Sequence, residues 1–403
     1  MSELSYLEKL LDGVEVEWKA VGDIAGYSTT KVDADKLDAT SFVGVDNLLA
    51  DKGGRIDATY QPNTARLTAY EPGDILLGNI RPYLKKVWMA ENNGGCSGDV
   101  LAIRILADCK KIISPEYLYY ALSSDSFFSY SMQHAKGAKM PRGSKDAILN
   151  YQIPIPCPSA PEKSLAIQSE IVRILDKFTA LTAELTAELT LRKKQYNYYR
   201  DKLLSFEEGE VEWKTLGEVA EYSKSRVSFD KLDKNNYVGV DNLLQNRAGK
   251  MQSNYVPTSG NLTEFREGDI LIGNIRPYLK KIWQADSTGG TNGDVLVIRS
   301  CHKSILPRYL YQILADDNFF EYNMQHAKGA KMPRGNKDAI MKYRVPIPSF
   351  DEQTRIVTIL DKFDTLTNSI SEGLPREIEL RQKQYEYYRD LLFSFPRPET
   401  SSN

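Results

Sequence analysis

The stretch GDILLGNIRPYLKKVW at 73–88 returns almost unchanged as GDILIGNIRPYLKKIW at 268–283. A second stretch behaves in the same way, with QHAKGAKMPRGSKDAI at 133–148 and QHAKGAKMPRGNKDAI at 325–340. Self-similarity on this scale indicates a repeated structural unit and must be recognised before the fold can be assigned. The sequence therefore predicts two copies of one domain.

Each copy combines strand patterns with helix patterns. Short β-rich runs such as FVGVDNLL, GDILLGNI and DVLAIRIL are separated by Gly, Asn and Pro, as strands and turns are. The segment PEYLYYALSSDSFFSYSM at 115–132 is predicted to form a helix beside these strands. We therefore expect an α+β fold with two α/β domains.

A long helix is predicted after each domain. Ser159-x-x-Glu162 and Ser349-x-x-Glu352 each fit a capping box, which marks a helix start. Apolar residues then recur at steps of three and four, which defines a helical stripe. The residues predicted to line this stripe are Ile171, Leu175, Phe178, Leu181, Leu185, Leu189, Ile356, Leu360, Phe363, Leu366, Ile370 and Leu374. Such a stripe can pack on its own domain, but two equivalent stripes in one chain favour an antiparallel coiled coil between the helices.

The first helix contains the tetrapeptide TAEL twice, at 182–185 and 186–189. Each unit lengthens a helix by about 6 Å, so the repeat is interpreted as a spacer. In the second helix, Gly373 and Pro375 are expected to kink or interrupt the corresponding region.

The start of the chain resembles the end of a helix. YLEKLLDGVEVEWK at the N-terminus is similar to YRDKLLSFEEGEVEWK from Tyr199, so we expect Leu10 and Leu11 to dock near the YYRDLLFSF segment at 387–395. The arrangement would be cyclic, with two halves related by a pseudo-two-fold axis. The predicted segments are 1–15 completing the distal helical region, domains at 16–158 and 207–348, helical spacers at 159–206 and 349–395, and a disordered tail at 396–403.

The composition excludes several classes of protein. No apolar run is long enough to span a bilayer, and the N-terminus lacks the features of a signal peptide, so we expect a soluble cytoplasmic protein without membrane contact. The four cysteines show neither metal-ligand spacing nor a disulfide framework. The net charge of -2 is unusual for a nucleic-acid binder, so any such function must rest on local basic segments.

A search for catalytic motifs finds none. The sequence lacks the Pro-Pro dipeptide that the motif of an adenine methyltransferase requires. It also lacks a Gly-rich loop for S-adenosylmethionine. GAKMPRGSK at 137–145 has the wrong spacing for a phosphate-binding loop. His134 and His326 are interpreted as structural hydrogen-bonding groups or DNA contacts, and His302 has no counterpart in the other copy. We therefore expect no catalysis by this chain alone.

Two basic segments in each copy are candidate DNA contacts. The first can read base edges, because Arg suits guanine and Asn suits adenine, although part of it could form a turn with its tyrosine in the core. Its residues are Asn79, Arg81, Tyr83, Lys85 and Lys86, with Asn274, Arg276, Tyr278, Lys280 and Lys281 in the second copy. The second segment is a glycine-containing basic loop suited to phosphates, or else an ordinary solvated loop. Its residues are Lys136, Lys139, Arg142 and Lys145, with Lys328, Lys331, Arg334 and Lys337.

The two domains, the helices containing IQSEIVRILDKF and QYNYYRDKLLSF, and the TAEL repeat resemble the specificity subunits of type I restriction-modification systems, in particular the type IC branch. The resemblance covers essentially the whole chain. It implies two target-recognition domains that bind double-stranded DNA, and helices that bind two modification subunits and, with them, two restriction subunits. It also implies that adenine-N6 methylation and DNA cleavage, with S-adenosylmethionine, ATP and Mg, belong to those partners.

The family usually pairs dissimilar recognition domains, whereas the two domains here are close copies. We therefore predict a bipartite, nearly palindromic target, with divergent segments such as ADKGGRIDATYQPNTAR and QNRAGKMQSNYVPTSGN making the half-sites differ slightly. The alternative from another class is a duplicated scaffold that binds protein or glycan.

Overall fold

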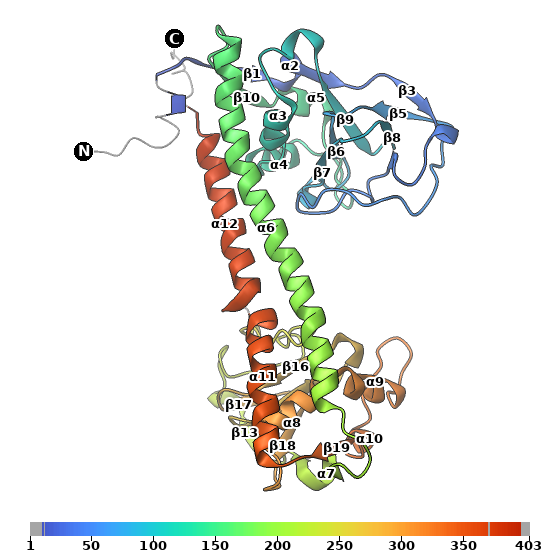
Figure 1. Cartoon of the computed structure of the whole chain (residues 1–403), viewed down its shortest axis with the longest axis vertical. Coiled ribbons are helices and arrows are strands. Elements are labelled where there is room, and N and C mark those ends of the chain that lie inside the picture. Colours follow the sequence, from blue (N-terminus) through green and yellow to red (C-terminus); the bar gives the residue numbers. More distant parts are fainter. Residues whose placement is uncertain (1–9, 12, 370, 396–403) are drawn as a thin grey trace, which may run out of the picture. The chain divides into compact units, whose positions relative to one another are not determined.

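The computed structural model describes residues 10, 11, 13–369 and 371–395 (Figure 1). The chain divides into two compact units, and their boundaries fall inside the long helices instead of at the ends of the repeated domains. Unit 1 comprises the residues up to Leu181 together with those from Gln382 onward, and unit 2 comprises Thr182–Arg381. Each repeated domain is thus joined in its unit by helical segments from two distant regions of the chain.

Unit 1 contains antiparallel strands and short helices around the first domain. The four-stranded sheets have the orders β2-β9-β6-β7 and β3-β5-β8-β4, in which only β4 and β8 pair in parallel, and β1 pairs with β10. The strands are β1 Val16–Ala20, β2 Ala25–Tyr27, β3 Lys31–Asp33, β4 Phe42–Val43, β5 Arg66–Tyr70, β6 Ile75–Gly78, β7 Val87–Met89, β8 Gly94–Cys96, β9 Val100–Ile105 and β10 Gln152–Pro156. The helices are α2 Val21–Ile24, η1 Ala34–Lys36, η2 Pro82–Leu84, η3 Ala107–Cys109, α3 Pro115–Leu122, α4 Asp125–Gln133 and α5 Lys145–Asn150.

Unit 2 repeats this plan with small differences. Its sheets have the orders β12-β18-β15-β16 and β13-β14-β17, and β11 pairs with β19. The counterpart of β4 is only a bridge between Tyr237 and Gly290. The strands are β11 Glu212–Thr215, β12 Ala220–Tyr222, β13 Arg226–Ser228, β14 Asn261–Phe265, β15 Ile270–Gly273, β16 Ile282–Gln284, β17 Gly289–Thr291, β18 Val295–Ser300 and β19 Arg344–Ile347. The helices are α7 Leu216–Val219, η4 Phe229–Lys231, η5 Pro277–Leu279, α8 Pro307–Leu314, α9 Asp317–Gln325 and α10 Lys337–Ile340.

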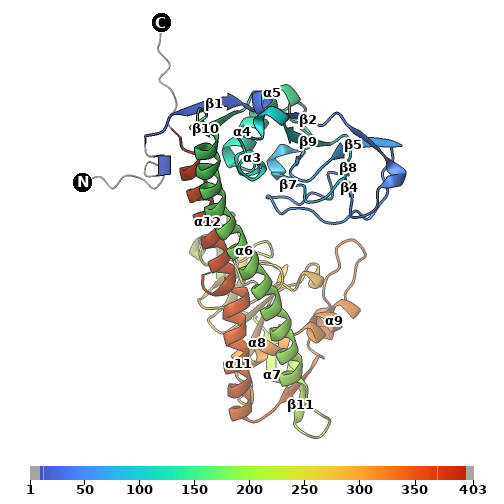
Figure 2. The ribbon, with the colours of Figure 1, turned by 45° about the horizontal axis from the view of Figure 1, so that its top comes forward.

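The core of unit 1 lies between the long helices and the sheets. Helices α3 and α4 occupy this layer in both views (Figures 1 and 2). Tyr117 and Leu118 of α3 are fully buried with Ile171 of α6 (Pro161–Leu204) and Ile75 of β6. Burial of such side chains stabilises a fold by about 1.5–3 kcal/mol each. The domain is therefore fixed to the helix that follows it.

One predicted helix is two helices in the structure. The 115–132 segment breaks after Leu122, and Ser124 caps α4 by accepting a hydrogen bond from the Phe127 N–H. The side chain of Ser124 also donates to the Ala121 carbonyl oxygen. Serine hydroxyls compete with helical hydrogen bonds in this way, so the Ser-Ser pair ends one helix and starts the next.

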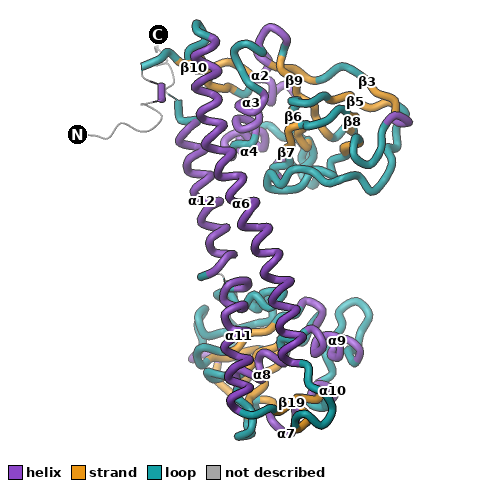
Figure 3. Tube along the Cα trace, viewed as in Figure 1, coloured by secondary structure: helices purple, strands orange, loops and turns teal. Residues whose placement is uncertain are grey.

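The long helices are present, and the second is interrupted as predicted. Helix α6 is continuous from Pro161 to Leu204, whereas the C-terminal helix forms α11 (Phe350–Asn368) and α12 (Gly373–Leu392) (Figure 3). Gly373 has a positive φ of 74°, a conformation that glycine adopts without steric cost.

Of the two predicted serine caps of the long helices, one is confirmed and one is wrong. Ser349 is the N-cap of α11 and accepts from the Glu352 N–H, although the Glu352 carboxylate pairs with Arg355. Ser159 is not the N-cap, because α6 starts at Pro161 and the Ser164 N–H donates to the carbonyl oxygen of Ala160, the residue just before the helix. Proline favours the first helical position and shifts the start by one residue.

The apolar stripe serves both of the roles that the sequence left open. Ile171 and Leu175 are buried in the core of unit 1, and Ile356 and Leu360 occupy the equivalent place in unit 2. Farther along, the stripe pairs helices: Phe178 stacks on Tyr388 with ring centroids 5.3 Å apart, and Phe363 stacks on Tyr196 and Tyr199. The residues of intermediate exposure are Leu181, Leu185, Leu189, Leu366 and Leu374, and Ile370 lies outside the described residues.

The helical segments in each unit run in opposite directions. In unit 1 the first part of α6 lies beside the last part of α12, and in unit 2 the last part of α6 lies beside α11 (Figures 1 and 2). The antiparallel pairing predicted from the stripe is therefore present within both units.

The predicted docking of the chain start is confirmed for the described residues. Leu11 is buried in one hydrophobic cluster with Leu392 and Phe395, and Leu10 packs against it. Residues 1–9 and 12, and the predicted tail at 396–403, lie outside the described residues. No helix among the residues that the structure describes is long and apolar enough to cross a membrane.

Candidate nucleic-acid interface

The two basic segments predicted from the sequence meet in each unit. In unit 1 the Arg81 N–H donates to the Pro141 carbonyl oxygen at 2.7 Å, and the Gly143 N–H donates to the Asn79 carbonyl oxygen at 3.0 Å. An isolated β-bridge joins Ile80 to Arg142. Segments 79–86 and 136–145 therefore form one surface, which we call the paired-loop surface.

Unit 2 builds the same surface from 274–281 and 328–337. The Arg276 N–H donates to the Pro333 carbonyl oxygen at 2.7 Å, and a bridge joins Ile275 to Arg334. The backbone repeats as well, with a φ of 53° at Arg81 and 52° at Arg276. A left-handed conformation at a non-glycine residue is uncommon and is maintained by its surroundings. Its recurrence shows that both domains position this arginine in the same way.

Most of the predicted contact residues are exposed on this surface. These are Arg81, Tyr83, Lys136, Lys139, Arg142 and Lys145 in unit 1, and Arg276, Tyr278, Lys328, Lys331, Arg334 and Lys337 in unit 2. Tyr83 and Tyr278 are each 49% exposed, so the alternative that this tyrosine packs into the core is wrong. Exposed cations with an aromatic ring among them are suited to a nucleic acid, because cations displace the counterions of phosphates.

The predicted asparagines lie beneath the surface. Asn79 is 8% exposed and Asn274 is 5% exposed. The Asn79 backbone bonds both neighbouring segments, since its N–H donates to the Asp99 carbonyl oxygen and its carbonyl accepts from Gly143. A Cβ atom added to Gly143 would lie 2.7 Å from Asn79 Oδ1. The asparagine and the glycine therefore position the loops.

The predicted lysine pairs also have internal partners. Lys85 Nζ donates to Asp125 Oδ1 at 2.8 Å, and Lys86 Nζ donates to the Val45 carbonyl oxygen at 2.7 Å. In unit 2, Lys280 bonds Asp317 and Lys281 bonds the Val240 carbonyl oxygen at the same places. These lysines hold the paired-loop surface to the rest of its domain.

Arg142 forms an exposed ion pair. Its Nη1 lies 2.5 Å from Asp99 Oδ1, and Arg334 makes the same contact with Asp294 at 2.7 Å. More than half of each arginine side chain remains exposed. Exposed pairs contribute little to stability, so the carboxylate mainly orients the guanidinium.

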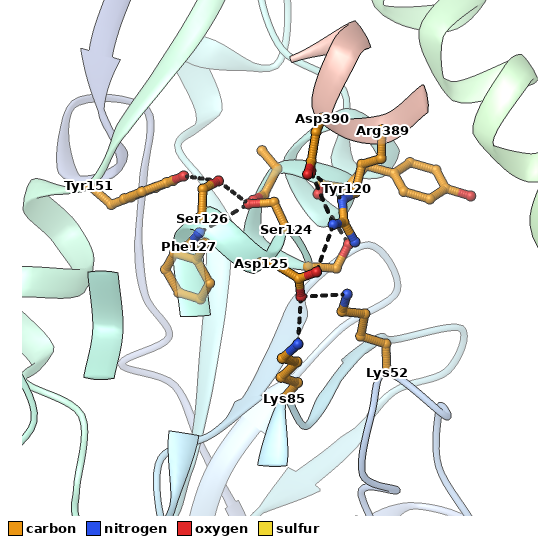
Figure 4. A network of polar contacts seen from close by, with 12 residues as sticks. Lys52, Lys85, Tyr120, Ser124, Asp125, Ser126, Phe127, Tyr151, Arg389 and Asp390 are labelled. Carbon is orange, nitrogen blue, oxygen red and sulfur yellow. Dashed lines mark hydrogen bonds and ion pairs between the residues drawn. The ribbon is translucent and has the colours of Figure 1, made fainter. Parts of the chain in front are cut away.

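A charge network under the surface was not predicted from the sequence. Asp125, the first residue of α4, accepts hydrogen bonds from Lys52 at 3.0 Å, from Lys85 at 2.8 Å and from Arg389 at 3.1 Å (Figure 4). Burial alone would raise the pKa of Asp125, but the hydrogen bonds from Lys85 and Lys52 and the charge of Arg389 lower it well below its ordinary value. The recurrence of this aspartate as Asp317 is the sequence signal that could have revealed it.

The histidines have a structural contact. His134 Nδ1 is 2.9 Å from the Tyr130 carbonyl oxygen at the end of α4, and His326 makes the same contact with Tyr322. Each imidazole also lies against the tyrosine ring. Among the described residues, no group of three or more His, Cys, Asp or Glu side chains is arranged to hold a metal ion.

Comparison with known proteins matches this chain to one family throughout. The model of the type I restriction modification DNA specificity domain matches residues 72–191 and 208–380. The EcoR124I/EcoR124II specificity subunit of Escherichia coli is 40% identical, with all of both chains covered. The EcoprrI specificity subunit of the same species is 33% identical, covering 92% of this chain and 93% of the relative. These comparisons give the scaffold alternative no support.

The fold is also similar to solved structures. The crystal structure of the S subunit of the type I restriction-modification system from M. genitalium has a TM-score of 0.56 at 14% identity, covering 96% of this chain and 98% of that one. A structure of a type I R-M system described for its assembly and conformational transition has a TM-score of 0.54 at 19% identity, covering 94% and 97%. With its two copies of the matched domain, the chain belongs to the family of type I restriction-modification DNA specificity subunits.

Proposed function

We propose that this specificity subunit recognises a bipartite DNA target that is nearly palindromic. Its two half-sites would have nearly the same sequence when read on opposite strands. The observation that carries the proposal is that both units build the same paired-loop surface, with equal backbone angles at Arg81 and Arg276 and at Lys85 and Lys280. Side chains of the same type on the same backbone offer the same hydrogen-bonding groups to base edges. The inverted order follows from the two-fold relation that the cyclic sequence repeat predicts.

Within each surface, we assign different roles to two kinds of cation. Arg81 and Arg276 are held rigidly at their backbones, and arginine suits guanine O6 and N7. Lys139 and Lys331 are exposed in glycine-containing loops, which suits contacts to phosphates. The arginines would therefore specify bases, and the lysines would supply affinity that is independent of sequence.

The methylome of a host that carries the system tests this proposal. We expect methyl-adenine in an interrupted sequence whose two specific parts match when read on opposite strands. Two unrelated half-sites would contradict the proposal.

A second part of the proposal concerns α6, whose unbroken course includes both TAEL units. Removing residues 182–185 shortens the helix by about 6 Å while leaving both domains intact. The gap between the half-sites should then change while the half-sites stay the same. A change in the half-sites themselves would show that this helix is not a spacer.

We also propose that chemistry resides in partner subunits: two modification subunits with S-adenosylmethionine, and two restriction subunits with ATP and Mg. The sequence has no recognisable catalytic motif, and the two repeated histidines, His134 and His326, make structural contacts. Purified chain with DNA and a labelled methyl donor should transfer no methyl groups until modification subunits are added. Methyl transfer by the chain alone would overturn this assignment.

A further inference from the structure

A short hairpin lies against the paired-loop surface in each unit. In unit 1, Leu48 bridges Arg55, and the Leu49 N–H donates to the Gly54 carbonyl oxygen at 2.9 Å. In unit 2, a bridge between Leu243 and Lys250 forms the same hairpin. We call these segments, 48–55 and 243–250, the tip hairpins.

The turn of each tip hairpin has an uncommon backbone. Asp51 and Lys52 have φ values of 53° and 62°, and Asn246 and Arg247 have values of 54° and 63°. Two successive positive φ values, with the Gly53 N–H donating to the Ala50 carbonyl oxygen at 3.1 Å, define a type I′ turn. Asp51 and Asn246 tolerate this conformation, but Lys52 and Arg247 adopt it at an energetic cost, and such costs are concentrated at functional sites.

The turn is held directly on the segment that carries Arg81. The Asp51 N–H donates to the Leu84 carbonyl oxygen and the Lys52 N–H to the Lys85 carbonyl oxygen, both at 2.9 Å. The equivalent bonds in unit 2 join Asn246 to Leu279 and Arg247 to Lys280. The tip is therefore a fixed part of the same surface.

Side chains on either side of the tip point into the domain. Lys52 joins the Asp125 network (Figure 4). The Arg55 guanidinium lies over the Trp88 ring, 4.9 Å from its centroid. In unit 2, Arg247 bonds Asp317, and Lys250 lies over Trp283. These contacts leave Asp51 exposed at the tip in unit 1, and Asn246 exposed beside Gln245 at the tip in unit 2.

The two units differ chemically at the equivalent residues Asp51 and Asn246. The exposed cations and the tyrosine of the paired-loop surface are the same in both copies, so they cannot make the half-sites differ. At the tip, unit 1 has a carboxylate and unit 2 has an amide. A carboxylate only accepts hydrogen bonds and suits cytosine N4, whereas an asparagine amide both donates and accepts and suits adenine N6 and N7.

We infer that Asp51 and Asn246 are specificity-determining residues that read one base pair in each half-site. Unit 1 reads cytosine at the position where unit 2 reads adenine. This inference rests on the proposed function, because it requires that the paired-loop surface lies on DNA.

The reciprocal variants Asp51→Asn and Asn246→Asp test the inference in the complete complex, with methylome sequencing as the readout. Asp51→Asn should change cytosine to adenine at one position of one half-site, and Asn246→Asp should make the opposite change in the other. The substituted subunits should fold, because the side chains are equal in size and Asn and Asp both tolerate a positive φ. Each change should shift the base preference at least about fivefold.

Asp108→Asn is the matched control, since it makes the same chemical change at an exposed residue of η3 outside these loops. It should leave the target unchanged. If a variant complex methylates nothing in cells, its binding to DNA duplexes with all four bases at each specific position gives the same readout. Preferences equal to those of the original complex at every position, or changed only at other positions, overturn the inference.

This outcome is separable from that of the proposed function. Unrelated half-sites in the original methylome would contradict the near-palindrome, whereas a single-base change caused by Asp51→Asn would still support the role of the tip. A near-palindromic methylome with both variants inert would support the proposed function and reject the role of the tip.

Discussion

Arg389 Nη2 lies 3.1 Å from Asp125 Oδ2, although 264 residues separate the two in the sequence. Arg389 belongs to α12 and has a completely buried side chain, and Asp125 begins α4 in the first domain. The same aspartate binds Lys85 of the paired-loop surface and Lys52 of the tip hairpin. The Asp125 carboxylate thus connects α12 to the paired-loop surface and to the tip hairpin, both of which we assign to DNA binding.

Replacing Arg389 with Met should destabilise unit 1. The change removes the charged hydrogen bond from α12 to Asp125, and such a bond contributes about 1.5–3 kcal/mol. Thermal unfolding followed by circular dichroism measures the loss. Arg355→Met is the control, because its pair with Glu352 is exposed, and it should melt as the unchanged chain does. Equal melting temperatures for all three chains would contradict the role of Arg389.

Acid should weaken unit 1 through Asp125. Its pKa is lower in the folded protein than in the unfolded chain, so its ion pairs contribute stability above the unfolded value of about 3.9 and lose it as the pH falls toward the folded pKa. Melting temperatures between about pH 6 and pH 3 should therefore fall more steeply for the unchanged chain than for Asp125→Asn, which cannot titrate at this site. Parallel curves would show that Asp125 does not contribute to the acid response.

Adding a methyl group at Gly143 should disturb the paired-loop surface. The new Cβ would lie 2.7 Å from the buried Asn79 Oδ1, so the two segments must separate. We expect the affinity of the assembled complex for its target to fall at least about tenfold, equivalent to about 1.4 kcal/mol. Gly98→Ala is the control, because a Cβ there meets nothing within 4 Å. The idea fails if both variants bind DNA equally well.

The two kinds of cation should give different binding defects. Lys139→Ala should reduce the dependence of log affinity on log salt by about one unit for every DNA sequence, because one phosphate contact is lost. Arg81→Ala should cost about 1–3 kcal/mol on the target only, which would relax specificity. Fluorescence anisotropy of the assembled complex across a salt series measures both. Lys110→Ala, at an exposed residue that follows η3, should change neither quantity. Identical defects for Arg81→Ala and Lys139→Ala would refute the division of roles.

The duplication, the long helices and the basic segments could be predicted from the sequence. Near-identical stretches must build the same local structure, and this is why Arg81 and Arg276 have the same backbone angles. Apolar spacing in α6 located the buried Ile171 and Leu175, and Gly373 marked the interruption before α12. All of these follow from local preferences, which neighbouring residues largely set.

The role of each polar side chain became clear from the folded domain and not from the sequence. Asn79, Lys85 and Lys86 had the same sequence signal as Arg81, yet they are buried or bonded inside the domain. The contacts of the tip hairpin and of the Asp125 network could not be assigned from the sequence, because their partners come from segments far apart in the chain. A hydrogen bond forms only between groups that folding brings within about 3 Å of each other. The spacing of residues along the sequence does not show which distant groups will meet. The repeat therefore revealed that there are two DNA readers, and the packing revealed which of their residues face outward.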